Sequence, residues 1–231
     1  MMQGGTFATI NRLLAAAYRR HKTPIVELTK IRTANPFLIL LTTILSSRTR
    51  DETTAQVSER LFTRVRSPQD LQALSVREIE SLIYPIGFYH TKARHLKQLP
   101  GVLRTRFNGS IPDSVEALCE LPGVGRKVAN LVVAVAFNKP AICVDVHVHR
   151  ICNRLGLLST RSPFETEMTL RRILPKRYWI NWNAYLVSHG QATCYPRNPR
   201  CDRCPVWRHC RRIGVNTRHL PNPEQNPKPA P

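Results

Sequence analysis

Apolar residues recur at helical spacing along most of this 231-residue chain. In the first twenty residues, apolar positions separated by one, three or four residues predict a helix. They are Ile10, Leu13, Leu14, Ala17 and Tyr18. A buried helix is also predicted over the longest apolar stretch, Phe37 to Leu45. The pattern therefore indicates helices from the first turn of the chain onward.

Helix starts are marked by short polar residues, often followed by proline or by glutamate three residues later. The side chain of such a residue accepts a hydrogen bond from a backbone N–H of the first turn. These starts are Asn35-Pro36, Ser67-Pro68, Ser75 with Glu78, Ser114, and Ser162-Pro163 with Glu165. Glycines between or just after the apolar stretches punctuate the helices: Gly87, Gly101, Gly109, Gly123, Gly156 and Gly190. The chain is predicted to be all-α, with many short helices.

Two segments rich in β-branched residues, 131–135 and 142–148, are also compatible with strands. Helices are favoured because the apolar residues of each region share one helical face. The first face holds Val128, Leu131, Val132 and Val135, and the second holds Val148, Ile151, Cys152 and Leu155.

The chain carries 35 Lys and Arg against 15 Asp and Glu, which gives a formal net charge of +20. A polyanion is attracted to such a surface, so nucleic acid is the leading partner, although charge does not separate DNA from RNA. The apolar stretch at 37–45 is shorter than the roughly 18 to 20 residues that cross a bilayer. We expect a soluble monomer that binds no membrane. The proline-rich tail, 216–231, is expected to be disordered.

A glycine-rich turn, Leu121-Pro122-Gly123-Val124-Gly125-Arg126-Lys127, separates two predicted helices and forms a helix-hairpin-helix. Its glycines permit a tight turn and close approach to a ligand, and backbone N–H groups at the second helix suit a phosphate. We therefore assign DNA binding to Gly123, Val124, Gly125 and Arg126. The alternative is an ordinary turn between helices.

Lys127 and Asp145 are the candidate catalytic residues. The positive end of the helix dipole and partial burial would lower the pKa of Lys127, and its neutral amine could attack the sugar C1′ and form a Schiff base. Asp145, eighteen residues later, could stabilise a cationic sugar. By residue type alone, the lysine could equally be a solvated charge and the aspartate an N-cap.

Four of the seven cysteines have the spacing C-x6-C-x2-C-x5-C, and they are Cys194, Cys201, Cys204 and Cys210. Four thiolates in a short loop indicate an iron-sulfur cluster or zinc, and the spacing leaves both open. This use of cysteine indicates a reducing, cytoplasmic or nucleoid-associated location. The other three, Cys119, Cys143 and Cys152, are expected to be buried. A basic face towards phosphates is expected from Arg197, Arg200, Arg203, Arg208, Arg211 and Arg212.

From about residue 10 to residue 212 the sequence resembles the endonuclease III family of helix-hairpin-helix glycosylases. The resemblance rests on LPGVGRKVAN at 121–130, VDVHVHRICNR at 144–154, the interval from Lys127 to Asp145, and the cysteine spacing. It implies a six-helix domain over 29–139, a discontinuous helical domain of 1–28 and 140–215, and an active cleft between them. It also implies a 4Fe-4S cluster on the four cysteines.

The same resemblance implies a bifunctional DNA glycosylase and AP lyase acting in base excision repair. Lys127 would be the Schiff-base nucleophile and Asp145 the essential carboxylate. The substrates would be oxidised pyrimidines, such as thymine glycol, and abasic sites in double-stranded DNA, nicked by β-elimination. The alternatives are a monofunctional mismatch or adenine glycosylase, against which Lys127 argues, and a non-catalytic DNA-binding module.

The family inserts a glutamine and a leucine into the gap that the extruded nucleotide leaves. In the corresponding segments, LSSRTRD and IGFYHTK, this chain has Arg48 and Phe88. Phe88 could act as an apolar wedge, and Arg48 could bind the orphaned base or a phosphate. Core packing of Phe88 and a solvated Arg48 are the alternatives.

Overall fold

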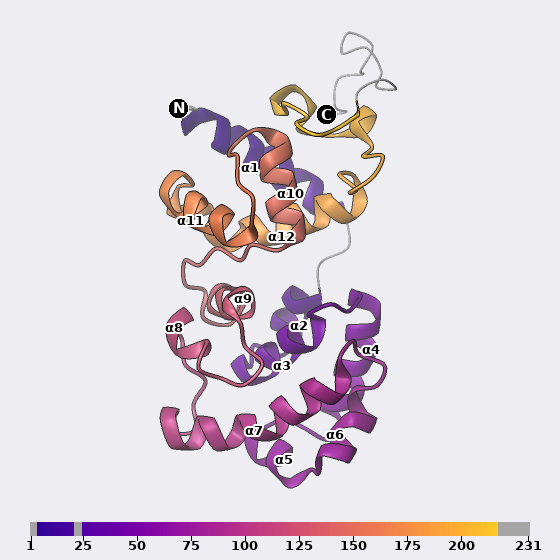
Figure 1. The fold of residues 1–231 in the computed structure, drawn as a ribbon, viewed down its shortest axis with the longest axis vertical. Coiled ribbons are helices and arrows are strands. Elements are labelled where there is room, and N and C mark those ends of the chain that lie inside the picture. The colour runs from indigo at the N-terminus through magenta and orange to yellow at the C-terminus, as the bar shows by residue number, and fades with distance from the viewer. Residues whose placement is uncertain (1–3, 21–24, 217–231) are drawn as a thin grey trace. The chain divides into compact units, whose positions relative to one another are not determined.

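The computed structural model describes residues 4–20 and 25–216, which form helices and no strand (Figure 1). The α-helices are α1 Gly4–Tyr18, α2 Ile25–Thr33, α3 Pro36–Ser46, α4 Asp51–Phe62, α5 Pro68–Ala73, α6 Val76–Ile83, α7 Tyr89–Phe107, α8 Val115–Leu118, α9 Arg126–Phe137, α10 Val146–Leu155, α11 Pro163–Ile173 and α12 Trp179–Ala192. Three 3-10 turns follow α11 and α12: η1 Lys176–Tyr178, η2 Cys201–Arg203 and η3 Trp207–His209. The predicted all-α class is confirmed.

The polar helix starts read from the sequence act as caps. The Asn35 side chain accepts from Phe37 N at 2.9 Å, and Ser114 caps α8 in the same way. The predicted capping box at α6 is confirmed, and Ser67 forms another with Asp70. At α11 the box is incomplete: Ser162 accepts from the Glu165 backbone, but the Glu165 carboxylate accepts from Arg161 N at 2.9 Å.

Two glycines do not punctuate helices as expected, because Gly101 lies inside α7 and Gly190 inside α12. A Cβ on Gly190 would lie 2.3 Å from His147 Nδ1, so that glycine is explained by close packing of α10 on α12. The helical interpretation of 131–135 is confirmed by α9. Of 142–148, only the residues from Val146 onward are helical, and they start α10.

The chain divides into two compact units, residues 24–143 and residues 1–23 with 144–231. In the first unit α3 is the central helix, packed against α2, α4 and α9, and every residue from Phe37 to Leu45 is buried. Its two threonines satisfy their hydroxyls inside the helix: Thr42 Oγ1 donates to Leu38 O and Thr43 Oγ1 to Ile39 O. This explains why polar residues are tolerated within the apolar run.

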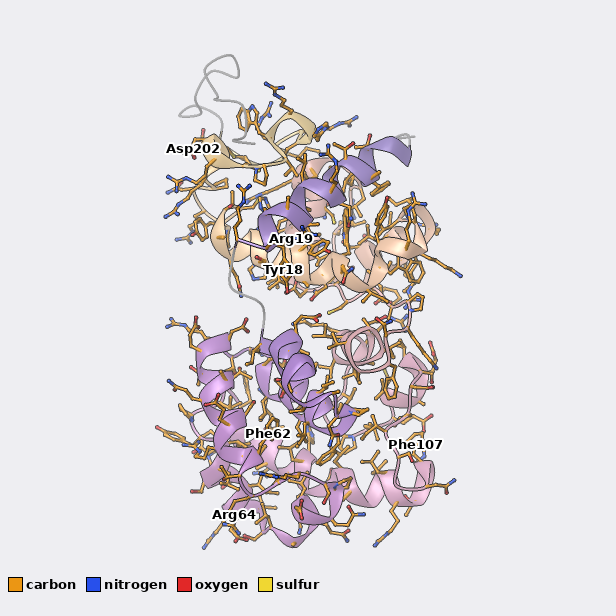
Figure 2. The ribbon with its side chains drawn as sticks, turned by 180° about the vertical axis from the view of Figure 1, so that it is seen from behind. Tyr18, Arg19, Phe62, Arg64, Phe107 and Asp202 are labelled. Atoms are coloured by element: carbon orange, nitrogen blue, oxygen red, sulfur yellow. The ribbon has the colours of Figure 1, made fainter. Side chains whose placement is uncertain are left out.

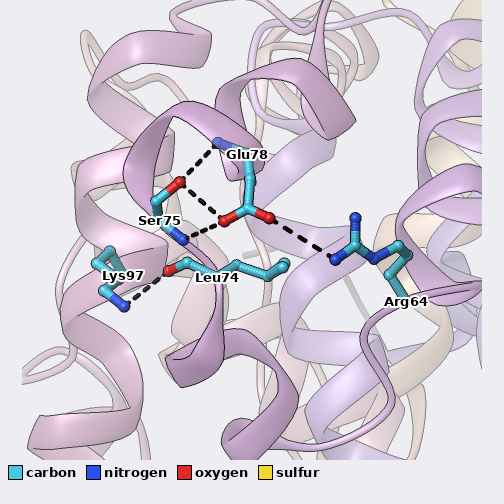
Figure 3. A network of polar contacts seen from close by, with 5 residues as sticks. All are labelled: Arg64, Leu74, Ser75, Glu78 and Lys97. Atoms are coloured by element: carbon cyan, nitrogen blue, oxygen red, sulfur yellow. Dashed lines mark hydrogen bonds and ion pairs between the residues drawn. The ribbon is translucent and has the colours of Figure 1, made fainter.

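A polar network in the same unit joins the segment after α4 to the end of α5, the start of α6 and α7 (Figure 3). Ser75 and Glu78 cap α6 reciprocally, and the Glu78 carboxylate lies 3.7 Å from the guanidinium of Arg64. Hydrogen bonds from Ser75 lower the pKa of Glu78. From α7, Lys97 Nζ donates to Gln72 O at 2.6 Å and Leu74 O at 2.7 Å, and so holds the end of α5.

The second unit is built around α12, which packs against α1 and α10. Trp182 of α12 is fully buried and meets the ring of Phe7 edge to face at 6.2 Å. The tail expected over 216–231 lies, apart from residue 216, outside the described residues. Among the helices that the structure describes, none is both long enough and apolar enough to span a membrane.

Candidate active site and cysteine pocket

The predicted helix-hairpin-helix is formed by α8, α9 and the turn between them. Leu121 N donates to Leu118 O, and Val124 N donates to Leu121 O, both at 3.1 Å. The side chains of Leu121 and Val124 are buried and anchor the turn, while Gly123 and Gly125 are exposed. The hairpin thus presents its glycine backbone outward on a packed apolar base.

Gly123 satisfies two requirements of this turn. Its φ of +77° lies in the left-handed region, where side chains are rarely accommodated, and a Cβ would lie 2.8 Å from His95 Nδ1. His95 belongs to α7, so the imidazole of that helix packs directly behind the hairpin. No role for His95 was predictable from local patterns, because its position behind the turn depends on tertiary packing.

The N-terminus of α9 is a candidate phosphate site. The first N–H groups of a helix have no partner inside it, and the N-cap residue, Gly125, has no side chain with which to cap them. The first turn contains no acidic residue. Lys127, the second residue of α9, adds a positive charge there. This arrangement suits an anion.

The partial burial expected of Lys127 is wrong, because its side chain is exposed. The buried side of α9 begins with the next residues, Val128, Ala129 and Asn130, and continues through Val132 to Val135. Lys127 precedes them on the outer surface of the helix. Its amine is therefore accessible within this unit.

Asp145 is the N-cap of α10. Its Oδ1 accepts hydrogen bonds from His147 N and Val148 N, each at 2.9 Å, and the residue is partly exposed. Residues 138–145 connect α9 to α10, and the boundary between the two units falls at 143/144. The carboxylate is thus held on its helix by the backbone and is also reachable from outside.

The four cysteines of the predicted ligand set line one pocket, with Arg154, His189 and Trp207 among its walls. Burial raises the pKa of Cys201 and Cys210 and raises that of Cys204 to about 12, and neighbouring cysteines act in the same direction. Thiolates so close together and so poorly hydrated require a compensating cation. In the part of the chain described here, no group of three or more His, Cys, Asp or Glu side chains is arranged to hold a single metal ion.

The cysteine loop is tied to α10 by two arginines that sequence reasoning missed. Arg150 Nη2 donates to Cys194 O at 2.8 Å. Arg154 donates to Tyr195 O at 2.5 Å and to Pro196 O at 2.6 Å. Their spacing of four residues on α10 was the one available signal, since it places both on one helical face.

The other cysteines and the loop arginines follow expectation only in part. Cys143 and Cys152 are buried, but Cys119, the C-cap of α8, is exposed. Nitrogen-tipped side chains project from the loop that carries Asp202 (Figure 2). Five of the six arginines are exposed. Arg212 is partly buried, with its guanidinium 4.2 Å from the Trp207 ring centroid, so it helps to pack the loop.

Arg48 and Phe88 lie on adjacent loops, after α3 and before α7. The guanidinium of Arg48 lies 5.2 Å from the ring centroid of Phe88. Phe88 is 61% exposed, so the core-packing alternative is wrong, and Arg48 is also exposed. Both residues have positive φ, 56° for Arg48 and 60° for Phe88. A left-handed backbone conformation at a residue other than glycine is unfavourable by about 1–3 kcal/mol, and such residues often lie at functional sites.

The family profile described as "HhH-GPD superfamily base excision DNA repair protein" matches residues 41–176. The chain therefore belongs to this superfamily of helical DNA-repair proteins. Endonuclease III of Thermotoga maritima is 45% identical over 176 residues, which cover 76% of this chain and 83% of that protein. Within the superfamily, the chain belongs to the endonuclease III family, and it is a DNA glycosylase and AP lyase.

Two solved structures support the same conclusion. A non-covalent endonuclease III–DNA complex matches with a TM-score of 0.80 and 36% identity, covering 92% of this chain and 97% of that one. A trapped endonuclease III–DNA covalent intermediate with an estranged adenine matches with a TM-score of 0.73 and 40% identity, covering 77% of this chain and 84% of that one. The resemblance read from the sequence is confirmed.

Proposed function

We propose that this enzyme removes oxidised pyrimidines such as thymine glycol from double-stranded DNA and nicks the strand 3′ to the resulting abasic site. The observation that carries the proposal is the exposed Lys127 amine in the first turn of α9, beside a helix terminus suited to phosphate. A lysine at that place can act as the nucleophile and form the Schiff base from which the lyase step proceeds.

In the proposed reaction the neutral Lys127 amine attacks C1′, and the damaged base leaves with the electrons of the glycosidic bond and takes up a proton. The amine loses its proton and the sugar ring opens, which gives a Schiff base between Nζ and C1′. Loss of a C2′ proton then breaks the C3′–O bond, with the 3′ phosphate as leaving group. Asp145 would stabilise the cationic sugar and accept protons in these steps.

We propose that Gly123, Val124, Gly125 and Arg126 hold the DNA backbone at the hairpin. Backbone N–H groups grip phosphate without reading the base sequence, as a repair enzyme that searches for rare lesions requires. The net charge of +20 strengthens this attraction, so binding should weaken as salt rises.

We propose that Phe88 enters the base stack where the damaged nucleotide is extruded and that Arg48 contacts the orphaned base. An exposed aromatic ring on a strained backbone suits a wedge that unstacks base steps. The guanidinium is already beside the ring and offers several donors to a base edge or a phosphate.

We propose that Cys194, Cys201, Cys204 and Cys210 hold a 4Fe-4S cluster. The donor set fits this group, since four thiols line one pocket, and burial raises the pKa of three of them, Cys201, Cys204 and Cys210, so that a bound cation would stabilise their thiolates. The bound cluster would cross-link the loop. Binding of the cluster would need the four cysteines to be reduced, which fits an intracellular, reducing location.

Metal analysis tests this assignment. Protein purified without exogenous metal is expected to contain about four iron atoms per chain and little zinc. Removing the iron by oxidation and chelation should make residues 194–212 sensitive to trypsin, because their arginines would lose a folded backbone around them. One stoichiometric zinc with no iron would overturn the cluster in favour of a zinc site.

The function itself is tested by borohydride trapping of the wild-type protein on a duplex containing thymine glycol, with an abasic duplex as control. A covalent complex on both is the expected result, because both pass through the Lys127 Schiff base. Trapping on the abasic duplex alone would keep the lyase and reject thymine glycol. Binding without trapping on either would favour a monofunctional enzyme or a binding module.

A further inference from the structure

A buried ammonium group lies beneath the two exposed loop residues, Arg48 and Phe88. It belongs to Lys92 of α7, which is 8% exposed. Its Nζ donates to Leu45 O at 2.9 Å and to Ser47 O at 2.7 Å, at the end of α3 and in the residue directly before Arg48. One side chain thus fixes the backbone that carries Arg48.

The same residue is one helical turn from Phe88. Lys92 N donates to Phe88 O at 3.0 Å, in the first turn of α7, where Phe88 is the N-cap. Lys92 therefore contacts both loops. Its backbone N–H binds Phe88 O, and its side chain binds the backbone just before Arg48. No side chain caps α7 at Phe88, so this backbone bond helps to define where the helix starts.

A second contact holds the two loops together beside Lys92. Gly87 N donates to Thr49 Oγ1 at 3.2 Å, and a Cβ on Gly87 would lie 2.8 Å from Arg48 O. The loops approach each other so closely that only glycine fits at this position. Arg48 and Phe88, each next to this contact in sequence, are thereby held side by side at 5.2 Å.

Placing a cation here has a physical cost, since burial lowers the pKa of Lys92 to about 8. An apolar side chain would avoid that cost but would leave the two carbonyl groups without their donor. The hydrogen bonds from the ammonium to these two carbonyl groups offset the desolvation penalty and fix the backbone before Arg48.

We propose that Lys92 is a positioning residue that holds Arg48 and Phe88 as one preformed wedge for the gap in the DNA duplex. This inference rests on the proposed function of those two side chains. A wedge that is ordered before binding loses little conformational entropy when it enters the base stack. Loosening the Arg48 loop should therefore impair reactions on duplex DNA, in which a partner strand must be separated, and spare reactions on single-stranded DNA.

The test replaces Lys92 by methionine and compares borohydride trapping rates on one abasic oligonucleotide, as a duplex and as a single strand. Lys97→Met is the matched control, because Lys97 lies on the same helix and also donates to two carbonyl groups, those of Gln72 and Leu74. For Lys92→Met we expect a fall of about tenfold or more on the duplex, in line with the sensitivity of catalysis to misplacement. The single-strand rate should stay within about threefold of wild type, which also shows that the variant is folded.

A double variant sharpens the result. If the Lys92 side chain acts through Arg48, then Lys92→Met combined with Arg48→Ala should lose no more duplex activity than the more impaired single variant. Equal losses on both DNA forms, a duplex-selective loss in Lys97→Met, or additive losses in the double variant would each overturn the proposal. Failure of thymine glycol excision by wild-type protein would instead concern the lesion, since the abasic substrate needs no base release.

Discussion

Replacing Lys127 by alanine is expected to abolish covalent trapping on abasic DNA, with a loss of roughly 10³-fold or more because the Schiff-base nucleophile is removed. Strand nicking should fall with it. The side chain is exposed and contributes no packing to the buried side of α9, so stability should change by less than about 0.5 kcal/mol. Trapping under borohydride and thermal unfolding of the same preparation measure both effects.

Lys127→Arg is the informative control. Arginine keeps the positive charge at the phosphate site but remains protonated, so it cannot act as the amine nucleophile. DNA affinity should therefore stay near wild type for Lys127→Arg and fall modestly for Lys127→Ala, while neither variant is trapped. If either variant is trapped at the wild-type rate, another residue is the nucleophile and the assignment of Lys127 is wrong.

The helices were predictable because their signals are local. Caps such as Asn35 and Ser75 depend on one side chain and the next three backbone N–H groups, and both form as the sequence indicates. The apolar run from Phe37 to Leu45 likewise becomes the buried central helix. The hairpin was recognisable from its glycines, since a tight turn favours glycine, and Gly123 has the positive φ, +77°, that such a turn uses.

Other features depend on contacts between distant segments, and local patterns do not reveal those contacts. Gly190 sits inside a helix because His147 of α10 packs against it, a contact across 43 residues that spacing alone does not reveal. The roles of Lys92 and Arg154 arise from carbonyl groups more than 40 positions away in sequence. Local patterns identified the candidate chemical groups, and tertiary packing determined what supports them.

Replacing Asp145 by asparagine is expected to slow base release by about 10²- to 10³-fold, because the carboxylate charge that would stabilise the cationic sugar is lost. The helix cap should survive. Asparagine is as good an N-cap as aspartate, and its side-chain oxygen can accept from His147 N and Val148 N as Asp145 Oδ1 does. DNA affinity should therefore stay within a few-fold of wild type, as measured by titration of an uncleavable duplex beside single-turnover base release.

Comparing Asp145→Ala with Asp145→Asn separates the effect of the charge from the effect of the helix cap. This variant loses both, so it should release the base as slowly as Asp145→Asn and also unfold about 1 kcal/mol more easily. If Asp145 were only a cap, Asp145→Asn would react at the wild-type rate and Asp145→Ala alone would be impaired, through weaker folding of α10. A slow Asp145→Asn variant with wild-type stability and DNA affinity is the combination that a purely structural aspartate cannot produce.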